Sequence, residues 1–151
     1  MSWRLTVLNA ILRTVGRPLL KRTKTPVRAR RDFGLTARIL FRGPRGNATR
    51  TEIGGVAALD VRPRTAQGDG VLLYFHGGGY ITGSPHTHLP MVGYLANKAG
   101  IRAVLPDYRL APEAPFPAAF DDALAVWGAL RADGVPAVSY THLTLPTKVL
   151  V

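Results

Sequence analysis

The sequence predicts an α/β fold in which a mostly parallel sheet is covered by helices. Two apolar runs carry this prediction, residues 71–75 and 101–105, and each reads as a strand with both faces buried. A helical pattern follows each run, over residues 86–99 and 118–132. The apolar residues of the second helix are Phe120, Leu124, Trp127 and Leu130. Strand, helix, strand and helix in this order are typical of parallel strands joined by crossovers.

Two helices are expected in the N-terminal third. Apolar residues recur at helical spacing from Trp3 to Val15, and Ser2 can cap the start of this segment. The second helix is expected to start at Thr25-Pro26, where a capping threonine precedes proline at the first helical position. One face of this second helix should carry Phe33, Ala37, Leu40 and Phe41.

A hairpin is expected between these helices and the buried strands. Residues 51–53 and 56–61 are short strand-like runs, and Gly54-Gly55 provides the turn between them. The whole chain of 151 residues is long enough for one domain with a sizeable core.

The positive charge is confined to the first third of the chain. The formal net charge is +11, with 20 Lys and Arg against 9 Asp and Glu. Residues 1–50 carry 13 of these bases and one acid, Asp32, so the remaining residues are close to neutral. A basic amphipathic helix can lie on a membrane or bind acidic partners. We favour two helices that pack on a core or cover a pocket, because both have an apolar face to bury.

Several protein classes are excluded by composition. The absence of cysteine excludes a disulfide framework, a thiolate metal site and a cysteine nucleophile. No apolar run is long enough to span a membrane, and Asn9 interrupts the stretch that would be a secretory signal. We therefore expect a cytoplasmic protein, although an Arg-rich, acid-poor N-terminus is also compatible with mitochondrial targeting.

Three consecutive glycines follow the strand at 71–75, in the stretch VLLYFHGGGYITG. Open α/β sheets bind ligands at this end of a parallel strand. A phosphate loop is excluded because no Gly-Lys-Ser/Thr follows, and a dinucleotide loop because Thr82 occupies the third glycine position. Bare backbone also serves as an oxyanion hole, in which two N–H groups point at one substrate oxygen.

Two motifs resemble the hormone-sensitive-lipase-like branch of the α/β-hydrolases, which contains bacterial carboxylesterases and lactone hydrolases. They are HGGGYITGSPHTH at 76–88 and LPDYRLAPEAPFPAAFDDAL at 105–124. The resemblance implies that Gly78 and Gly79 supply oxyanion-hole N–H groups and that His76 anchors the loop. Gly77 and Tyr80 would support it, with Tyr80 either touching substrate or packing beside the loop. No cofactor is implied.

Other polar residues receive structural interpretations. His86 and His88 have the spacing of a metal pair but fall at a helix start without a third ligand, so we expect no metal site. The resemblance makes Asp107, Arg109 and Glu113 architectural charges that fix the loop after a strand. Finally, we expect a solvated helix face to carry Asp121 and Asp122.

The nucleophile of the family is not found in this sequence. The family places serine in Gly-x-Ser-x-Gly, and none of Ser2, Ser84 and Ser139 has these flanking glycines. The string VSYTHLTLPT at 138–147 resembles the translation of a sequencing-library adapter, although valine, tyrosine and threonine also favour a genuine strand. The acid and histidine of the triad should follow the serine, and would lie beyond Val151.

The resemblance therefore implies a truncated α/β-hydrolase fold: N-terminal cap helices plus the first half of a mostly parallel sheet. We expect a helical cap segment at 1–49, half of the core at 50–137 and a non-native tail at 138–151. In the sheet that the resemblance implies, the strand at 71–75 lies between the strand at 101–105 and one that follows residue 137. The implied function is hydrolysis of a small ester or lactone by serine acyl transfer, with this chain inactive as written. The alternative is a basic membrane-surface or nucleic-acid-binding protein acting through residues 1–50, although no nucleic-acid motif is present.

Overall fold

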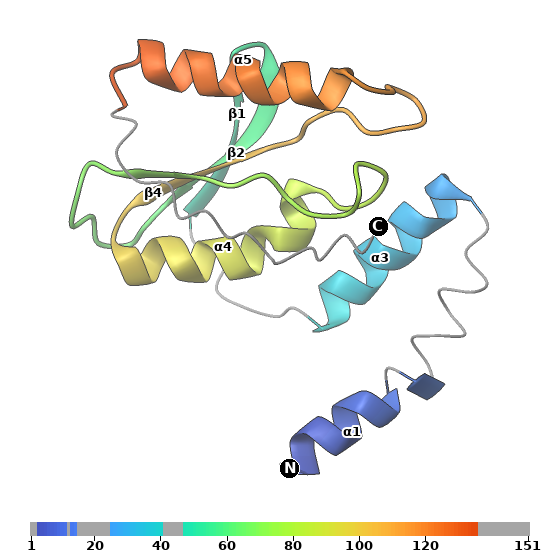
Figure 1. Ribbon diagram of the computed structural model, residues 1–151. Helices are drawn as coiled ribbons and strands as arrows, with labels where there is room; N and C mark the ends of the chain where they lie inside the picture. Colours follow the sequence, from blue (N-terminus) through green and yellow to red (C-terminus); the bar gives the residue numbers. More distant parts are fainter. Residues whose placement is uncertain (1–2, 12, 15–24, 41–46, 136–151) are drawn as a thin grey trace, which may run out of the picture.

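The computed structural model describes residues 3–11, 13–14, 25–40 and 47–135. In this part of the chain a sheet lies between two helices, α4 on one face and α5 on the other (Figure 1). Helix α3 lies near one end of α4, and helix α1 stands apart from the other elements (Figure 1). The layered α/β architecture predicted from the sequence is thus confirmed.

The sheet has four strands in the spatial order β1-β2-β4-β3. Strands β1 (Asn47–Ile53) and β2 (Val56–Arg62) form the expected antiparallel hairpin, which closes at the Ile53–Val56 pair. Its first strand begins earlier than the sequence suggested. Strands β3 (Val71–Leu73) and β4 (Arg102–Pro106) correspond to the two apolar runs. Strand β3 ends two residues earlier than predicted, and its residues are only half-buried.

The strands of this sheet run in mixed directions. Strand β3 pairs in parallel with β4, with Leu72 opposite Ala103, as expected for two strands joined by a helix. Strand β2 is antiparallel to both of its neighbours, and the two-residue turn after β1 explains the first of these pairings. Within the described ranges β3 has no partner on its other side. A neighbour there, from the chain after residue 137, remains a prediction.

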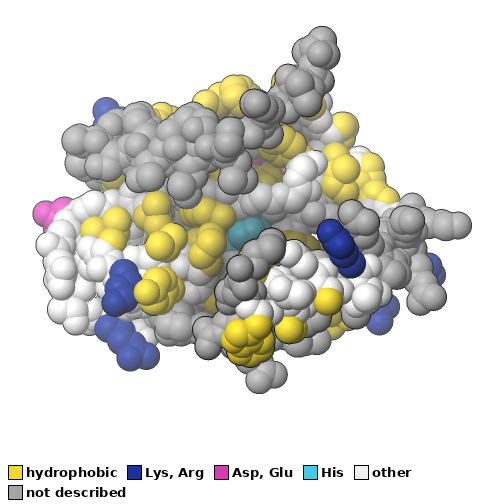
Figure 2. Space-filling view, turned by 60° about the horizontal axis from the view of Figure 1, so that its bottom comes forward, with side chains coloured by type: hydrophobic (Ala, Val, Ile, Leu, Met, Phe, Trp, Pro, Cys, Tyr) yellow, Lys and Arg dark blue, Asp and Glu magenta, His cyan; other side chains and the backbone are white. Residues whose placement is uncertain are grey.

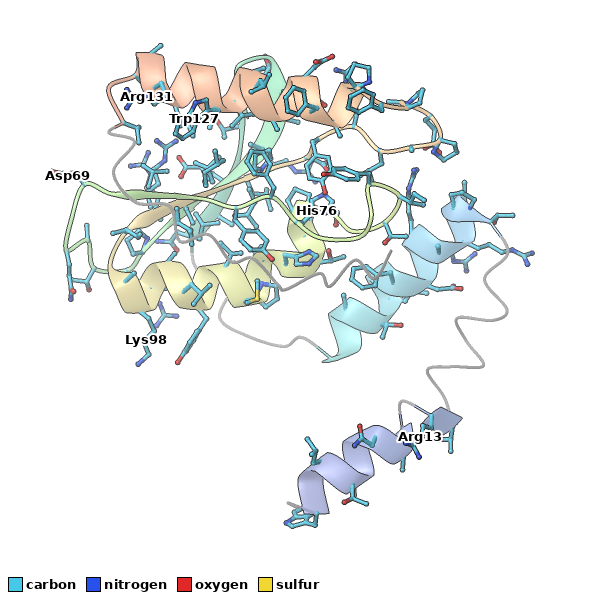
Figure 3. All side chains as sticks on the ribbon, in the orientation of Figure 1. Arg13, Asp69, His76, Lys98, Trp127 and Arg131 are labelled. Atoms are coloured by element: carbon cyan, nitrogen blue, oxygen red, sulfur yellow. The ribbon has the colours of Figure 1, made fainter. Side chains whose placement is uncertain are left out.

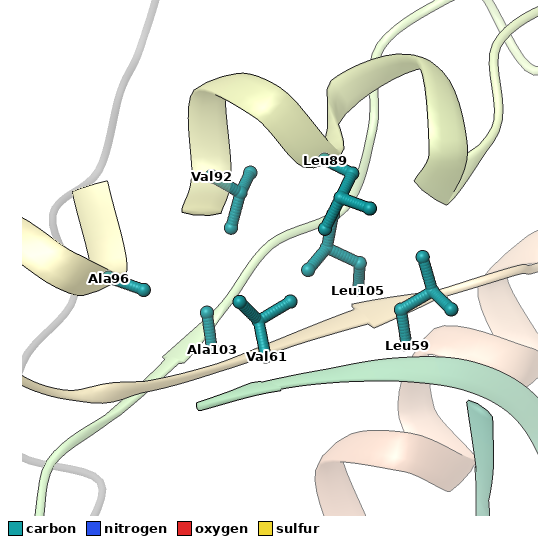
Figure 4. Packing of buried hydrophobic residues seen from close by; sticks show 7 residues of the cluster. All are labelled: Leu59, Val61, Leu89, Val92, Ala96, Ala103 and Leu105. Atoms are coloured by element: carbon teal, nitrogen blue, oxygen red, sulfur yellow. The ribbon is translucent and has the colours of Figure 1, made fainter. Parts of the chain in front are cut away.

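Helix α4 (Pro85–Ala99) has strong signals at both ends. Ser84 and Thr87 exchange side-chain and backbone hydrogen bonds as a capping box, and Gly100 ends the helix in the left-handed conformation. Its inner face buries Leu89, Val92 and Ala96 against β2 and β4 (Figure 4). This packing fixes the start of α4, and with it the end of the glycine loop that precedes it.

Helix α5 (Ala118–Ala132) has the predicted bounds, but a different face is buried. The buried residues include Val126 and Leu130, which pack on the side of the sheet opposite α4. We expected an apolar face with Phe120 and Leu124 as well, yet these side chains are 56% and 52% exposed. They lie two positions from the buried Asp122 and Val126, which places them across the helix.

The two N-terminal helices differ in their packing. Helix α3 (Pro26–Leu40) begins where predicted, since the Thr25 hydroxyl accepts a hydrogen bond from the Arg28 N–H at 3.4 Å. It packs against α4 and buries Ala37, as expected, whereas Phe33 of the same expected face is exposed. Helix α1 (Trp3–Ile11) differs from that expectation, because its apolar side chains are largely exposed: Trp3, Leu5 and Val7. Phe41 and the segment 138–147 lie outside the described residues.

Candidate oxyanion site

The loop between β3 and α4 requires glycine at two positions. Gly78 has φ 137° and Gly83 has φ 91°, values that side-chain-bearing residues rarely adopt. A methyl group on Gly78 would overlap the Thr82 carbonyl, and one on Gly83 would lie 2.6 Å from the His76 Nδ1. The close approach of backbone to backbone therefore explains why this loop contains so few side chains.

Gly79 differs from these two glycines. Its φ is 62°, but a methyl group there would meet nothing within 4 Å. The peptide N–H groups of Gly78 and Gly79 have no hydrogen-bond acceptor among the described residues, and both residues are exposed. The loop thus presents two unpaired donors on open backbone, which is the chemical requirement for holding a developing oxyanion.

The turn that follows the glycines is closed by hydrogen bonds to one carbonyl. The Gly78 carbonyl accepts from the N–H of Ile81 at 3.2 Å, and from the N–H and hydroxyl of Thr82 at 3.0 Å each. Tyr80, which lies between Gly78 and Ile81 in the chain, has φ 60°, a left-handed conformation that residues other than glycine rarely adopt. Its ring is 66% exposed and stands edge-on to Tyr108, so Tyr80 lies beside the loop with a face open to solvent.

His76 is buried under the loop (Figure 3). Its ring stacks on Tyr108 with centroids 4.3 Å apart, and the Tyr108 hydroxyl donates a hydrogen bond to the His76 carbonyl. Burial lowers the pKa of His76, so its ring is neutral at pH 7. Nδ1 lies 3.1 Å from the Gly77 carbonyl, to which it donates when it carries the proton. The anchoring role expected for His76 stays a prediction, and these contacts are the ones that such a role would use.

Tyr108 was not identified from the sequence as a site residue. It is buried, and burial together with Tyr80 and Tyr74 raises its pKa to about 12, so its hydroxyl is a proton donor at neutral pH. Its position within the stretch LPDYRLAPE was the only available signal, because a tyrosine after a buried strand has no periodicity of its own.

The loop after β4, residues 107–117, is held by paired charges. Arg109 donates to both carboxylate oxygens of Asp122, at 2.7 to 3.0 Å, and its backbone N–H donates to the same carboxylate at 2.8 Å. These hydrogen bonds lower the pKa of Asp122. The expectation that Asp122 lies on a solvated face is therefore wrong, because the carboxylate faces the loop and is only 7% exposed, whereas Asp121 is exposed.

The other two predicted architectural charges behave differently from each other. Glu113 forms an ion pair with Arg30 of α3 at 2.6 Å, which agrees with a structural role. Hydrogen bonding from Arg30 lowers the pKa of Glu113. The Asp107 side chain is exposed, and its contribution comes from the backbone, whose N–H donates to the Ala57 carbonyl at 2.8 Å.

His86 and His88 do not form a metal centre with other residues of the described part. His86 is exposed, while His88 stacks on His76 with centroids 5.7 Å apart. Across the described ranges, no group of three His, Cys, Asp or Glu side chains could hold a metal ion. Ser84 is engaged in capping α4.

A basic cavity of about 630 Å³ lies between α3, β1 and the start of α4. Its lining includes Arg30, Arg31, Arg50 and His86, and it does not include Gly78 or Gly79. Figure 2 shows one face of the molecule, on which hydrophobic side chains form several clusters with Lys and Arg side chains around them. No helix in the described residues is both long enough and apolar enough to cross a bilayer.

The chain matches known proteins over most of its length. Residues 72–145 match a family model described as alpha/beta hydrolase fold. LipR of Mycobacterium tuberculosis is 35% identical over 136 residues, which cover 89% of this chain and 44% of LipR. An acetyl-hydrolase of Streptomyces hygroscopicus is 44% identical over 84 residues, or 56% of this chain and 28% of that protein.

Solved structures agree with this match. A hormone-sensitive lipase from a metagenome library superimposes with a TM-score of 0.72 at 36% identity, covering 89% of this chain and 44% of that one. An esterase from the bacterial hormone-sensitive lipase family gives a TM-score of 0.69 at 38% identity, covering 75% and 38%.

The layered sheet, the glycine loop at the end of β3 and these matches define the chain as an α/β-hydrolase. Within that fold, it belongs to the hormone-sensitive-lipase-like branch, as its two motifs had suggested. The chain spans less than half the length of these relatives.

Proposed function

We propose that this sequence encodes the N-terminal part of a carboxylic ester or lactone hydrolase, in which the N–H groups of Gly78 and Gly79 bind the substrate carbonyl oxygen. The observation that carries the proposal is the pair of unpaired donors on open backbone at the carboxyl end of β3. A tetrahedral intermediate places negative charge on that oxygen, so two fixed donors stabilise it more than the ground-state carbonyl.

The nucleophile in this proposal is a serine in a Gly-x-Ser-x-Gly turn, followed in chain order by an acid and a histidine. Ser84 does not fit, because its hydroxyl caps α4, and neither Ser2 nor Ser139 has flanking glycines. We therefore propose that the chain as written is inactive. The extended hydrolase, in which this sequence up to residue 137 continues to the length of its relatives, would be the active enzyme.

Short-chain p-nitrophenyl esters test both halves of this proposal. We expect turnover by the extended hydrolase, abolished by a serine-directed phosphonate, and no turnover by the 151-residue chain. Phosphonate-sensitive turnover that follows the purified short chain would contradict its inactivity. An extended hydrolase inactive toward both esters and lactones would contradict the function.

The oxyanion role is tested by Gly79→Ala in the extended hydrolase. The added methyl group meets open space where the substrate oxygen would approach, so we expect kcat to fall about 100-fold with little change in KM. The matched control is Gly55→Ala in the β1–β2 turn, which has a similar φ of 77° and equally open surroundings. A rise in KM with unchanged kcat would remove Gly79 from the oxyanion role.

The division of the chain forms a further part of the proposal. Residues 1–49 would cover the site as a cap, residues 50–137 would form half of the core, and residues 138–151 would be non-native. The family match runs to residue 145 and so includes part of this tail. The proposal that the tail is non-native therefore rests only on the resemblance of residues 138–147 to an adapter. Genomic DNA that keeps the coding sequence of VSYTHLTLPT would refute it.

The alternative, a basic surface binder acting through residues 1–50, has weaker support. Exposed Trp3, Leu5 and Val7 on α1 would suit a membrane surface, whereas Arg30 of α3 is paired with Glu113 of the core. Salt-sensitive binding of anionic vesicles or DNA by the extended hydrolase, lost on deletion of residues 1–24, would favour this alternative. The cytoplasmic location is likewise a proposal, testable by fractionation.

A further inference from the structure

Arg30 joins the N-terminal helix α3 to the two loops that build the site. Its Nε donates to the Ile81 carbonyl at 2.6 Å, and one Nη donates to the Ala111 carbonyl. The guanidinium also donates to both carboxylate oxygens of Glu113, at 2.9 and 2.6 Å. A planar fork with five donors suits such a set of acceptors, which a lysine ammonium cannot reproduce.

The acceptors of Arg30 lie on either side of the contact between these loops. Ile81 belongs to the loop after β3, whereas Ala111 and Glu113 belong to the loop after β4. The loops also meet directly, since the Ala111 N–H donates to the Tyr80 carbonyl at 2.8 Å. The consecutive carbonyls of Tyr80 and Ile81 are therefore both held, one by backbone and one by Arg30.

These two carbonyls belong to the turn that orients the glycines. The Ile81 and Thr82 N–H groups donate to the Gly78 carbonyl, so the positions of Tyr80 and Ile81 determine how Gly78 and Gly79 are presented. Tyr80 sits at φ 60°, a conformation that persists only where surrounding contacts enforce it. Arg30, with its side chain only 27% exposed, is one of those contacts.

We propose that Arg30 is a positioning residue through which α3 holds the oxyanion loop in its donor-presenting conformation. Packing of α3 against the loops would then be coupled to the conformation in which the Gly78 and Gly79 N–H groups can bind a substrate oxygen. The catalytic part of this proposal rests on the proposed function, whereas the coupling between α3 and the loop does not.

Variants of the extended hydrolase test the coupling without reference to activity. We expect Arg30→Ala to increase hydrogen exchange at the Ile81 and Thr82 amides about tenfold, because those amides report the turn. Arg28→Ala is the matched control: Arg28 lies on the same helix, is exposed, and its side chain forms no hydrogen bond or ion pair with the described residues. It should leave exchange at both amides unchanged.

Kinetics then separate a positioning role from simple anchoring of α3. Arg30→Ala should lower kcat about tenfold with KM altered less than threefold, and Arg30→Lys should not restore kcat. Glu113→Gln is a milder change, because the amide keeps one acceptor for the Arg30 guanidinium, and it should lower kcat by an intermediate amount. This variant tests the proposal even if Arg30→Ala does not fold.

The outcomes distinguish this proposal from the proposed function. Faster exchange across residues 26–37 with unchanged exchange at Ile81 and Thr82, or a kcat fully restored by Arg30→Lys, would overturn the positioning role. If the parent enzyme hydrolyses no ester or lactone, the proposed function fails, and the exchange measurements still decide whether α3 holds the loop.

Discussion

The loops after the parallel strands β3 and β4 are held in their conformations by different means. The loop after β3 takes its shape from glycines at positive φ and presents bare backbone. The loop after β4 is held by charged side chains, Arg109 on Asp122 and Glu113 on Arg30. The second loop supports the first through Tyr108 and Ala111. A loop shaped by glycines is thus stabilised by side chains of the neighbouring loop.

The largest effect should come from crowding the bare loop itself. In the extended hydrolase, Gly83→Ala combines a strained φ of 91° with overlap on the Gly77 carbonyl and His76. We expect it to lower the free energy of unfolding by about 3 kcal/mol or more, as measured by urea denaturation. Gly134→Ala tests the backbone strain alone, because Gly134 has φ 80° and an added methyl group would meet nothing within 4 Å. It should lower the free energy of unfolding by only about 1–2 kcal/mol. Equal losses would show that close packing does not shape this loop.

Removing the charge support from the second loop should have the next largest effect. Asp122→Ala removes the carboxylate that accepts from the Arg109 backbone N–H and guanidinium, and we expect Tm to fall by about 5 °C. Asp121→Ala, on the exposed side of the same helix, is the control and should shift Tm by no more than about 1 °C. A comparable fall in both variants would refute the distinction between the two carboxylates.

The contact between the loops is tested by Tyr108→Phe, which keeps the stacked ring and removes the hydroxyl. The His76 carbonyl then loses its donor in a buried position, so we expect a loss of about 1–2 kcal/mol in unfolding free energy. Hydrogen exchange should increase at Ile81 and Thr82. Tyr94→Phe on the exposed face of α4 serves as the control. An unchanged stability would mean that the hydroxyl does not support the glycine loop.

The smallest effect should appear on lowering the pH. Burial holds the pKa of His76 below that of an unfolded histidine, about 6.5, so the unfolded state takes up the proton first. The stability contributed by the neutral ring is therefore complete above pH 6.5 and is lost as pH falls below it. Thermal melts between pH 8 and pH 5 should show this loss, and His76→Asn should reduce it. A pH dependence identical in His76→Asn would assign the effect to other groups.

The elements best predicted from the sequence were those with local signals at both ends. Gly54-Gly55 fixed the expected hairpin turn, and Gly100 fixed the end of α4. The face of α5 was partly wrong, because apolar Phe120 and Leu124 are exposed while the charged Asp122 is buried by its pairing with Arg109. Hydrophobicity alone cannot reveal that an arginine thirteen residues away will bury a carboxylate.

The sequence indicated a loop with few side chains, but it did not indicate the side chains that hold this loop in place. The run of three glycines indicated a loop of exposed backbone, since only a few functions require consecutive residues without side chains. The contacts of Arg30 and Tyr108 with this loop join residues up to 51 positions apart in the sequence, so no local spacing records them. In the sequence Arg30 is one of many arginines in a basic segment, and only the fold distinguishes it from Arg28.

The free edge of β3 has a practical consequence for protein engineering. Within the described residues, β3 ends the sheet with one side unpaired, so the proposed remainder of the hydrolase would join this chain along a single strand seam. The two pieces could therefore be encoded as separate polypeptides and fused to any pair of interacting proteins. Ester turnover would then appear only when the fusion partners meet, which would make the enzyme a split reporter of molecular proximity.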